Sequence, residues 1–251
     1  MSARLFRRLL VDDRDAGRRR EAEICGRRGR VGGFAGEGDS PNGAVIFLDG
    51  SNLYAGTTAG NPVTGTGQND GLFGGDGADT LAGGAGADVL QGNQGADSLS
   101  GGNGNDTIFG GKDGDTIDVG LGSNFAQGNI GNDTITAAAA STSGNILLGG
   151  QGDDSIIGGA GADIISGDLG NDTLAGGGGN DSMFGQAGDD QISVGDGTNT
   201  VDGGDGDDTV STGTGSNTVN AGAGDDHVVF GTGVAGGKNF AGKIAGAQES
   251  H

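Results

Sequence analysis

The residue pattern of this chain returns every nine residues, and this period restricts its possible folds more than any other feature. Between Gly38 and Val229 the sequence divides into twenty-one units of nine residues, interrupted once by the three residues Ala137–Ala139. A fixed period of this kind predicts a solenoid, in which each unit buries its apolar side chains only by stacking on its neighbours. We number the residues of each unit as places one to nine.

Place eight is apolar in every unit, and the residues on both sides of it are mostly polar. Because alternate side chains of a strand face opposite ways, this pattern predicts a very short strand with one inward residue per unit. A flexible glycine-rich linker would not keep an apolar residue at all of these positions. The predicted inward residues are Val45, Tyr54, Val63, Leu72, Leu81, Leu90, Leu99, Ile108, Ile117, Ala126, Ile135, Leu147, Ile156, Ile165, Leu174, Met183, Ile192, Val201, Val210, Val219 and Val228.

Place six is Asp in fourteen units and Asn in six, with Gly43 as the exception, and places one, two and four are mostly glycine. So many glycines at a fixed spacing indicate turns that need positive φ or close backbone approach. Aspartate and turn carbonyl oxygens are hard donors, and flexible coordination by oxygen favours calcium over magnesium or a transition metal. The predicted calcium ligands are Asp70, Asp79, Asp88, Asp97, Asp106, Asp115, Asp133, Asp154, Asp163, Asp172, Asp181, Asp190, Asp208 and Asp226.

Composition argues against a conventional core, since 62 of the 251 residues are glycine and only 32% are hydrophobic. The formal net charge of -21 is segregated, because residues 1–30 carry +5 and the remainder carries -26. An acidic chain of this kind repels nucleic acid and anionic membranes, and it needs cations to become compact. The single cysteine, Cys25, excludes an intrachain disulfide and a cysteine zinc cluster.

The chain divides into three parts: a basic leader at 1–37 that we expect to be disordered, the repeat region at 38–229, and a tail or cap at 230–251. The only apolar run of the leader, Leu5–Val11, is interrupted by arginine. It is too short and too charged for a signal peptide or a membrane span. The leader is either a basic arm for a polyanion or a solvated extension without a partner.

The units GGDGADTLA, GGNGNDTIF and GGAGADIIS match the nonapeptide G-G-x-G-x-D-x-U-x, so the repeat region resembles the RTX (repeats-in-toxin) calcium-binding proteins. The resemblance implies an all-β fold, a right-handed parallel β-roll with two nonapeptides per coil and therefore about ten coils. It further implies that the GGxGxD portion turns and binds calcium while the last three residues of each unit form a strand. Each ion would lie between successive turns on one side, held by their aspartates and carbonyls.

Alternate units lie on opposite sides of such a roll, and the place-six residues divide unequally between the two sides. We interpret the three alanines as a surface bulge that preserves this alternation, so that one side carries nine successive aspartates from Asp79 to Asp226. The other side carries five of the six asparagines, which offer no charge to a hard cation. Its aspartates fall into two groups: Asp70, Asp88 and Asp106, then Asp163 and Asp181. Counting one site between each successive pair predicts about eleven full-strength calcium sites.

We expect folding and calcium binding to be one process, because the metal-free chain has too little apolar surface to offset its ordering entropy. Calcium sites of the extracellular type would leave the chain open in the cytosol and fold it outside. The protein is therefore predicted to be secreted and extracellular or attached to the cell surface, and the family resemblance implies export by a type I secretion system. The tail is shorter than the usual signal of that system, and Phe230, Phe240 and Ile244 offer an alternative role as a cap of the roll.

An enzymatic function is not predicted, because the only histidines are His227 and His251 and no Cys-His, Ser-His-Asp or zinc-helix set can be assembled. The first alternative to a calcium-binding roll is a detached C-terminal module of a secreted protease, lipase, epimerase or haemolysin. An ice-binding roll would need a regular outward ladder, and the irregular residues at place three argue against it. An adhesive or surface-layer element remains a further alternative, since it would use the same rod.

Overall fold

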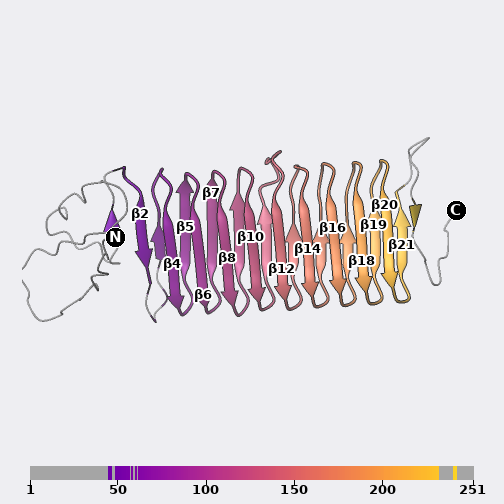
Figure 1. Cartoon of the computed structure of the whole chain (residues 1–251), viewed down its shortest axis with the longest axis horizontal. Helices are drawn as coiled ribbons and strands as arrows, with labels where there is room; N and C mark the ends of the chain where they lie inside the picture. Colours follow the sequence, from indigo (N-terminus) through magenta and orange to yellow (C-terminus); the bar gives the residue numbers. More distant parts are fainter. Residues whose placement is uncertain are drawn as a thin grey trace, which may run out of the picture.

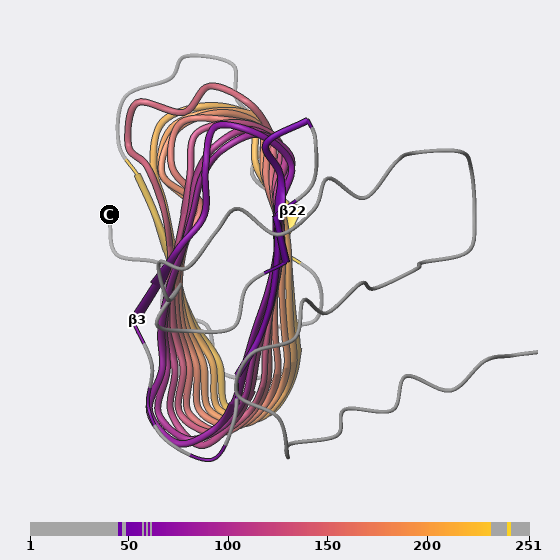
Figure 2. The ribbon, with the colours of Figure 1, turned by 90° about the vertical axis from the view of Figure 1, so that its left-hand side faces the viewer.

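The computed structural model describes residues 45–46, 49–56, 58, 60, 62–231 and 240–241 as strands and turns without a helix. Twenty-two strands form two sheets that face each other along a straight rod (Figure 1). Seen along the rod, the coils superimpose as one flattened loop with two long sides (Figure 2). The prediction of an all-β parallel roll with about ten coils is confirmed.

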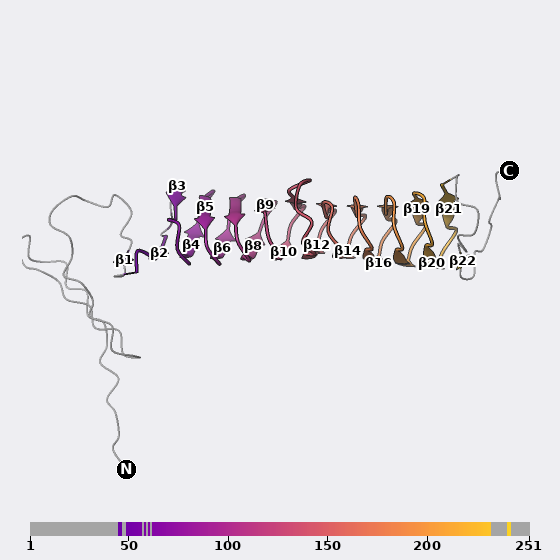
Figure 3. The ribbon, with the colours of Figure 1, turned by 90° about the horizontal axis from the view of Figure 1, so that it is seen from above.

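The two sheets contain alternate strands of the chain and lie in separate rows when the rod is seen from above (Figure 3). The twelve-stranded sheet contains, in spatial order, β1 (Val45–Ile46), β2 (Asn52–Ala55), β4 (Gly71–Asp76), β6 (Val89–Gln94), β8 (Thr107–Lys112), β10 (Phe125–Ile130), β12 (Ile146–Gln151), β14 (Ile164–Leu169), β16 (Ser182–Ala187), β18 (Thr200–Asp205), β20 (Thr218–Ala223) and β22 (Phe240–Ala241). The ten-stranded sheet contains β3 (Pro62–Thr64), β5 (Thr80–Ala85), β7 (Ser98–Asn103), β9 (Thr116–Gly120), β11 (Thr134–Ala137), β13 (Ser155–Ile157), β15 (Thr173–Ala175), β17 (Gln191–Ser193), β19 (Thr209–Thr212) and β21 (His227–Phe230).

Equivalent residues of successive coils pair directly in register. Leu72 of β4 pairs with Leu90 of β6, and Leu90 pairs with Ile108 of β8. On the other sheet Leu81 pairs in the same way with Leu99. Partners eighteen residues apart confirm that one coil contains two nonapeptides. All pairs are parallel except that of β1 with β2.

The core is a double row of place-eight side chains. Every place-eight residue from Tyr54 to Val219 is at most 8% exposed, and Val228 is partly buried against the same cluster. Each coil therefore contributes only two such side chains, one from each sheet. The predicted inward residues are confirmed over this range, while the side chain of Val45 lies outside the described residues.

Many strands are longer than the three residues that the family resemblance implies, although β3, β13, β15 and β17 have that length. In β4, β6 and β8 they run over six residues, from place seven of one unit to place three of the next. Because strand side chains alternate, place one faces inward as well as place eight. It is glycine in most units, and Val119 and Val194 fill it in two others, where both are fully buried.

The alanine interruption is a turn on the surface of the roll, as predicted, but it begins one residue later. Ala137 is a buried strand residue, whereas Ala139 and Ala140 are exposed in a turn that the Ser141 N–H closes on the Ala138 carbonyl at 2.8 Å. Figure 1 shows this loop projecting beyond its neighbours. Strand β11 still pairs in parallel with β9 before the insertion and β13 after it, so the phase of the roll is preserved.

The two ends of the repeat region differ in how much of them the structure describes. The predicted leader, 1–37, lies outside the described residues. At the other end β22 adds to β20 as the last strand of its sheet, and Phe230 packs against the core cluster. Ile244, which was considered as part of a cap, lies outside the described residues.

The adjacent residues Ile156 and Ile157 provide a test of the core, since Ile156 is fully buried and Ile157 is 45% exposed. We expect Ile156→Ala to lower the free energy of unfolding by about 2–5 kcal/mol, because it leaves a cavity between tightly stacked coils. Ile157→Ala should change it by less than about 0.5 kcal/mol. Denaturant unfolding at saturating calcium measures both, and equal losses in the two variants would contradict this description of the core.

Candidate metal sites

The place-six side chains form two straight rows, one along each edge of the flattened roll. The first row occupies the turns that follow strands of the twelve-stranded sheet, and it contains the unbroken series from Asp79 to Asp226. The second occupies the turns that follow the ten-stranded sheet, and there Asp and Asn alternate in groups. All fourteen predicted aspartates are buried, with exposures of 1–6%. The structure thus brings the predicted residues together in two sets, with the division between edges that the sequence indicated.

One carboxylate oxygen of each aspartate is fixed by the preceding coil. The backbone N–H of Asp97 donates to Asp115 Oδ1 at 2.8 Å, and that of Asp115 donates to Asp133 Oδ1 at 2.7 Å. The row continues across the alanine turn, where the Asp133 N–H donates to Asp154 Oδ1 at 2.7 Å. This bond places Asp133 and Asp154 on the same edge and confirms the interpretation of the insertion as a bulge.

The second carboxylate oxygen points inward and lacks a hydrogen-bond partner in most of the row. Burying a carboxylate oxygen without a partner is costly, so native proteins rarely leave one unless a ligand or ion satisfies it. At Asp70 the Thr66 backbone N–H and hydroxyl supply partners instead. The buried Oδ2 atoms without a hydrogen-bond partner belong to Asp88, Asp97, Asp106, Asp115, Asp133, Asp154, Asp163, Asp172, Asp181, Asp190, Asp208 and Asp226.

The inward oxygen faces a space that exists because the residue at place one is glycine and has no side chain. A Cβ added to Gly158 would lie 2.6 Å from Asp163 Oδ2 and 2.8 Å from the carbonyl oxygen of Gly176 in the next coil. The inward carboxylate oxygen and a main-chain oxygen of the next coil therefore both border the space that a place-one side chain would occupy. Thirteen of the fourteen aspartates have glycine at place one, and only Asp226 is preceded by Ala221.

Main-chain oxygens are needed to complete any cation site at these edges. Among the described residues no three His, Cys, Asp or Glu side chains gather around one point. Each aspartate turn contributes a single buried carboxylate, at place six. The turns stack so closely that a Cβ on Gly95, which has φ of 114°, would overlap the Gly77 carbonyl. Carboxylates in a row, with carbonyls of tight glycine turns between them, are an all-oxygen donor set that fits calcium.

Several units with asparagine at place six lack glycine at place one, and the contacts of the asparagine explain why. Asn124 Oδ1 accepts the Asp106 N–H at 2.8 Å, as an aspartate would, while its Nδ2 turns toward the Gly122 carbonyl at 3.4 Å. The amide carries no charged inward oxygen, and place one of this unit is filled by Val119. Val194 and Asn199 repeat the pair. Glycine with aspartate and valine with asparagine are therefore alternative ways of filling the same space.

Burial raises the pKa of the row carboxyls, and neighbouring carboxylates raise several of them further. The pKa rises from an ordinary 3.8 to about 7 at Asp115, Asp154 and Asp190. It rises to about 6 at Asp133, Asp163 and Asp208, with desolvation as the largest cause in each case. The pKa is also raised by burial at Asp88, Asp97, Asp106, Asp172 and Asp181. Ionised carboxylates at these positions therefore need a positive charge beside them.

A family model described as the RTX calcium-binding nonapeptide repeat (4 copies) matches residues 55–90, 82–117, 91–126, 118–141, 140–174, 166–201 and 202–234. The chain belongs to this family. A comparison with curated proteins gives no match. Family and fold together support calcium binding by the RTX repeats. Within the described part of the chain there is no helix of the length and apolarity that crossing a membrane requires.

A second, outer ladder at place five was missed by the sequence reasoning. Asn105 Oδ1 accepts the Ser123 N–H at 2.9 Å, and Asp189 Oδ1 accepts the Asp207 N–H at 2.8 Å. These bonds run in the opposite direction to the place-six row, because the side chain accepts from the following coil. The sequence signal for this ladder was the recurrence of Asn and Asp at place five. Its hydrogen bonds stabilise the turns without adding a buried charge.

The raised pKa values predict how the calcium-free roll depends on pH. A carboxyl whose pKa is higher in the folded chain stabilises the fold below its unfolded value of 3.8, and this contribution is lost as the pH rises through about 6–7. In the presence of a chelator we therefore expect more β-structure at about pH 4 than at about pH 8. Far-UV circular dichroism measures this, with sedimentation to check that the acid state is monomeric. A larger β signal at the higher pH would contradict the argument.

The coupling between places one and six can be tested by making one coil resemble the next. A Cβ at Gly176 would overlap Asp181 Oδ2, with the Val194 carbonyl oxygen at 3.0 Å. We expect Gly176→Val to lower the free energy of unfolding by about 1–3 kcal/mol through overpacking. Combined with Asp181→Asn, which reproduces the Val194–Asn199 pair, it should cost less than the two single variants together by at least about 0.5 kcal/mol. Additive losses at saturating calcium would show that the two places are independent.

Proposed function

We propose that this RTX β-roll is a non-enzymatic calcium-binding module that folds when calcium fills its two edges outside the cell. The observation that supports this most directly is the buried series of Oδ2 atoms beside place-one glycines. These oxygens have no hydrogen-bond partner, and at most of these units a main-chain oxygen of the next coil borders the same space as the carboxylate oxygen. Calcium would supply the positive charge and oxygen coordination that this arrangement lacks.

Each ion is proposed to lie between two successive aspartates of one edge, so that most aspartates take part in two sites. The nine aspartates from Asp79 to Asp226 give eight sites along the first edge. On the second edge the asparagine turns interrupt the row and leave three. The full-strength total is about eleven, and the residues proposed to hold calcium are the fourteen place-six aspartates named above.

Calcium binding and folding are coupled in this proposal because neither part of a site exists in the open chain. A site needs turns from two coils, and the coils stack only when their carboxylates are neutralised. The core cannot replace the ions, since each coil buries two place-eight side chains against the ordering entropy of eighteen residues. The chain's own contribution is to fix Oδ1 by backbone hydrogen bonds and to aim Oδ2 at the next coil.

The expected affinity determines where the protein folds. Extracellular calcium modules bind with dissociation constants on the order of 10⁻⁴ to 10⁻³ M, so the cytosol would leave such a chain unfolded. RTX repeats are typical of secreted proteins, which supports an extracellular or cell-surface location. We propose export in the open state by a type I secretion system, with 38–229 as the calcium-binding unit, 1–37 as a leader and 230–251 as a cap or tail.

Titration with calcium, followed by far-UV circular dichroism, tests the proposed function. We expect a cooperative change from coil to β-structure as calcium rises through about 10⁻⁴ to 10⁻³ M, and little change with magnesium at the same concentrations. Magnesium prefers small octahedral shells and keeps its water, so it suits these tight turns poorly. A chain that remains coil at roughly ten times the upper concentration, or that responds equally to both ions, would rule the proposal out.

The number of ions bound by single variants tests the arrangement of the sites. Asp154→Asn should remove two full-strength sites, because Asp154 lies inside the row, whereas Asp226→Asn at its end should remove one. Asp153→Asn is the matched control, since Asp153 is exposed at place five and asparagine keeps its Oδ1 acceptor. Equilibrium dialysis with calorimetry counts the ions. Equal losses from Asp154→Asn and Asp153→Asn would exclude place six as the source of the ligands.

A further inference from the structure

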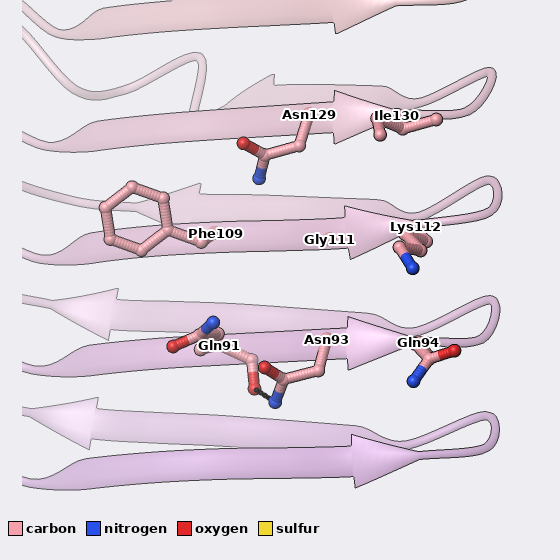
Figure 4. Close-up of a pocket in the computed structure, with 8 residues that line it drawn as sticks. All are labelled: Gln91, Asn93, Gln94, Phe109, Gly111, Lys112, Asn129 and Ile130. Atoms are coloured by element: carbon pink, nitrogen blue, oxygen red, sulfur yellow. Dashed lines mark hydrogen bonds between the residues drawn. The ribbon is translucent and has the colours of Figure 1, made fainter.

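An open groove of about 440 Å³ lies on the outer face of the twelve-stranded sheet, and one end of it reaches the strand ends that precede the first row of aspartates. It extends over β6, β8 and β10 (Figure 4). Its floor is Gly111 of β8, which has no side chain to fill the space above the sheet. The residues that line it are Gln91, Asn93, Gln94, Phe109, Gly111, Lys112, Asn129 and Ile130.

The two strands that flank β8 carry the same three residues, Gln-Gly-Asn, of which Gln91, Asn93 and Asn129 line the groove. Asn93 of β6 and Asn129 of β10 both pair with Gly111 and so lie on opposite sides of it, with the Asn129 side chain leaning toward Gly111 and the Asn93 side chain leaning away from it (Figure 4). Two strand spacings separate β6 from β10 by roughly 10 Å, which is wide enough to admit one sugar ring. Neither calcium binding nor the core uses these outward side chains.

The two asparagines adopt a backbone conformation that glycine adopts in most other coils at place two. Asn93 has φ of 85° and Asn129 has φ of 82°, and non-glycine residues in this region often mark functional sites. Each amide Nδ2 donates only to the carbonyl of its own strand, to Gln91 and to Gln127, at 3.4 Å in both cases. Bonds of this length are weak, so both amides are available to a ligand as donor and acceptor.

The remaining two sides of the groove differ in chemistry. Phe109 is half-buried, tilted against Phe125 with ring centroids 5.7 Å apart, and it offers a fixed apolar surface. Lys112 is exposed at the opposite end and is the single Lys or Arg between residues 45 and 231. No ion pair of Lys112 occurs among the described residues, so its ammonium group can donate hydrogen bonds to a ligand.

We propose that this groove binds a neutral hexose unit of a glycan. The Asn129 amide would bond its hydroxyl groups from one side, and the Asn93 amide would do so from the other once it exchanges its weak bond to Gln91 for one to the ligand. The Phe109 ring would pack against the C–H face of the sugar, and Lys112 would donate to a hydroxyl or ring oxygen. The groove offers uncharged amides and an aromatic ring, which suit hydroxyl groups and C–H faces, so the ligand is assigned as neutral and an anionic glycan serves as the comparison. The groove goes beyond the proposed calcium function, and it needs only the folded roll.

Nuclear magnetic resonance of the ¹⁵N-labelled, calcium-loaded chain tests this proposal through the side-chain amide signals. The probes are neutral oligosaccharides of glucose, mannose or galactose, with polygalacturonate as the anionic comparison. We expect at least one neutral probe to shift the Asn93 and Asn129 amide signals with a dissociation constant on the order of 1 mM or lower. The double variant Asn93→Gly with Asn129→Gly should raise this dissociation constant at least about tenfold, as measured from the backbone amide shifts of the groove residues.

The variants are chosen so that loss of binding and loss of fold can be separated. Glycine is the usual residue at place two, so both replacements fit the local backbone without strain. Gln186→Gly on β16, where φ is 81°, is the same kind of change outside the groove and should leave binding unchanged. No shift with any neutral probe, a shift with polygalacturonate only, or unchanged binding by the double variant would each overturn the proposal.

Discussion

The fold depends on how the buried carboxylates at the two edges of the roll are neutralised. Along the first edge the carboxylates of Asp79 to Asp226 lie one above another in successive coils, and backbone hydrogen bonds to Oδ1 hold them there. Desolvation and repulsion between neighbours raise the pKa of several of these groups to about 6 or 7. A core of two place-eight side chains per coil is too thin to overcome this cost in the ionised state. An ion shared by two coils removes the repulsion and joins the coils at once, so the same interaction provides both stability and a response to calcium.

The glycines follow from this constraint and are not simply a means of flexibility. Place one must be small because the inward carboxylate oxygen of the same unit occupies the space of a side chain. In two of the units where an amide replaces the carboxylate, valine occupies place one and fills the interior, namely Val119 with Asn124 and Val194 with Asn199. A coil can therefore gain stability either from an ion or from an additional buried side chain. The second edge alternates between these two solutions, whereas the first uses the ion throughout its aspartate series.

Much of this structure could be predicted from the sequence because the repeat makes each position visible twenty-one times. The inward residues at place eight follow from period and polarity alone, and the division of aspartates between the edges follows once the family resemblance supplies two nonapeptides per coil. The inward direction of place one was not predictable, because a glycine gives no polarity signal and the strands were expected to be only three residues long. The exact start of the alanine turn was missed for a related reason, since Ala137 suits either a surface turn or the interior. The groove was missed because it depends on differences between coils, which a search for the common pattern averages away.

The differences between coils occur at some places of the nonapeptide and not at others, because the places differ in which way their side chains face. Places one, six and eight face the interior or the edges, and stacking allows little change there. Places three, seven and nine face outward on the sheets, so that residues as different as Gln91 and Phe109 occupy the same register. Place two lies between these two groups in how freely it varies, because a residue other than glycine, such as Asn93 or Asn129, must adopt a positive φ there. A rod of this kind can therefore keep one calcium-dependent frame while individual strands acquire binding surfaces, and the strained asparagines around Gly111 are the clearest example in this chain.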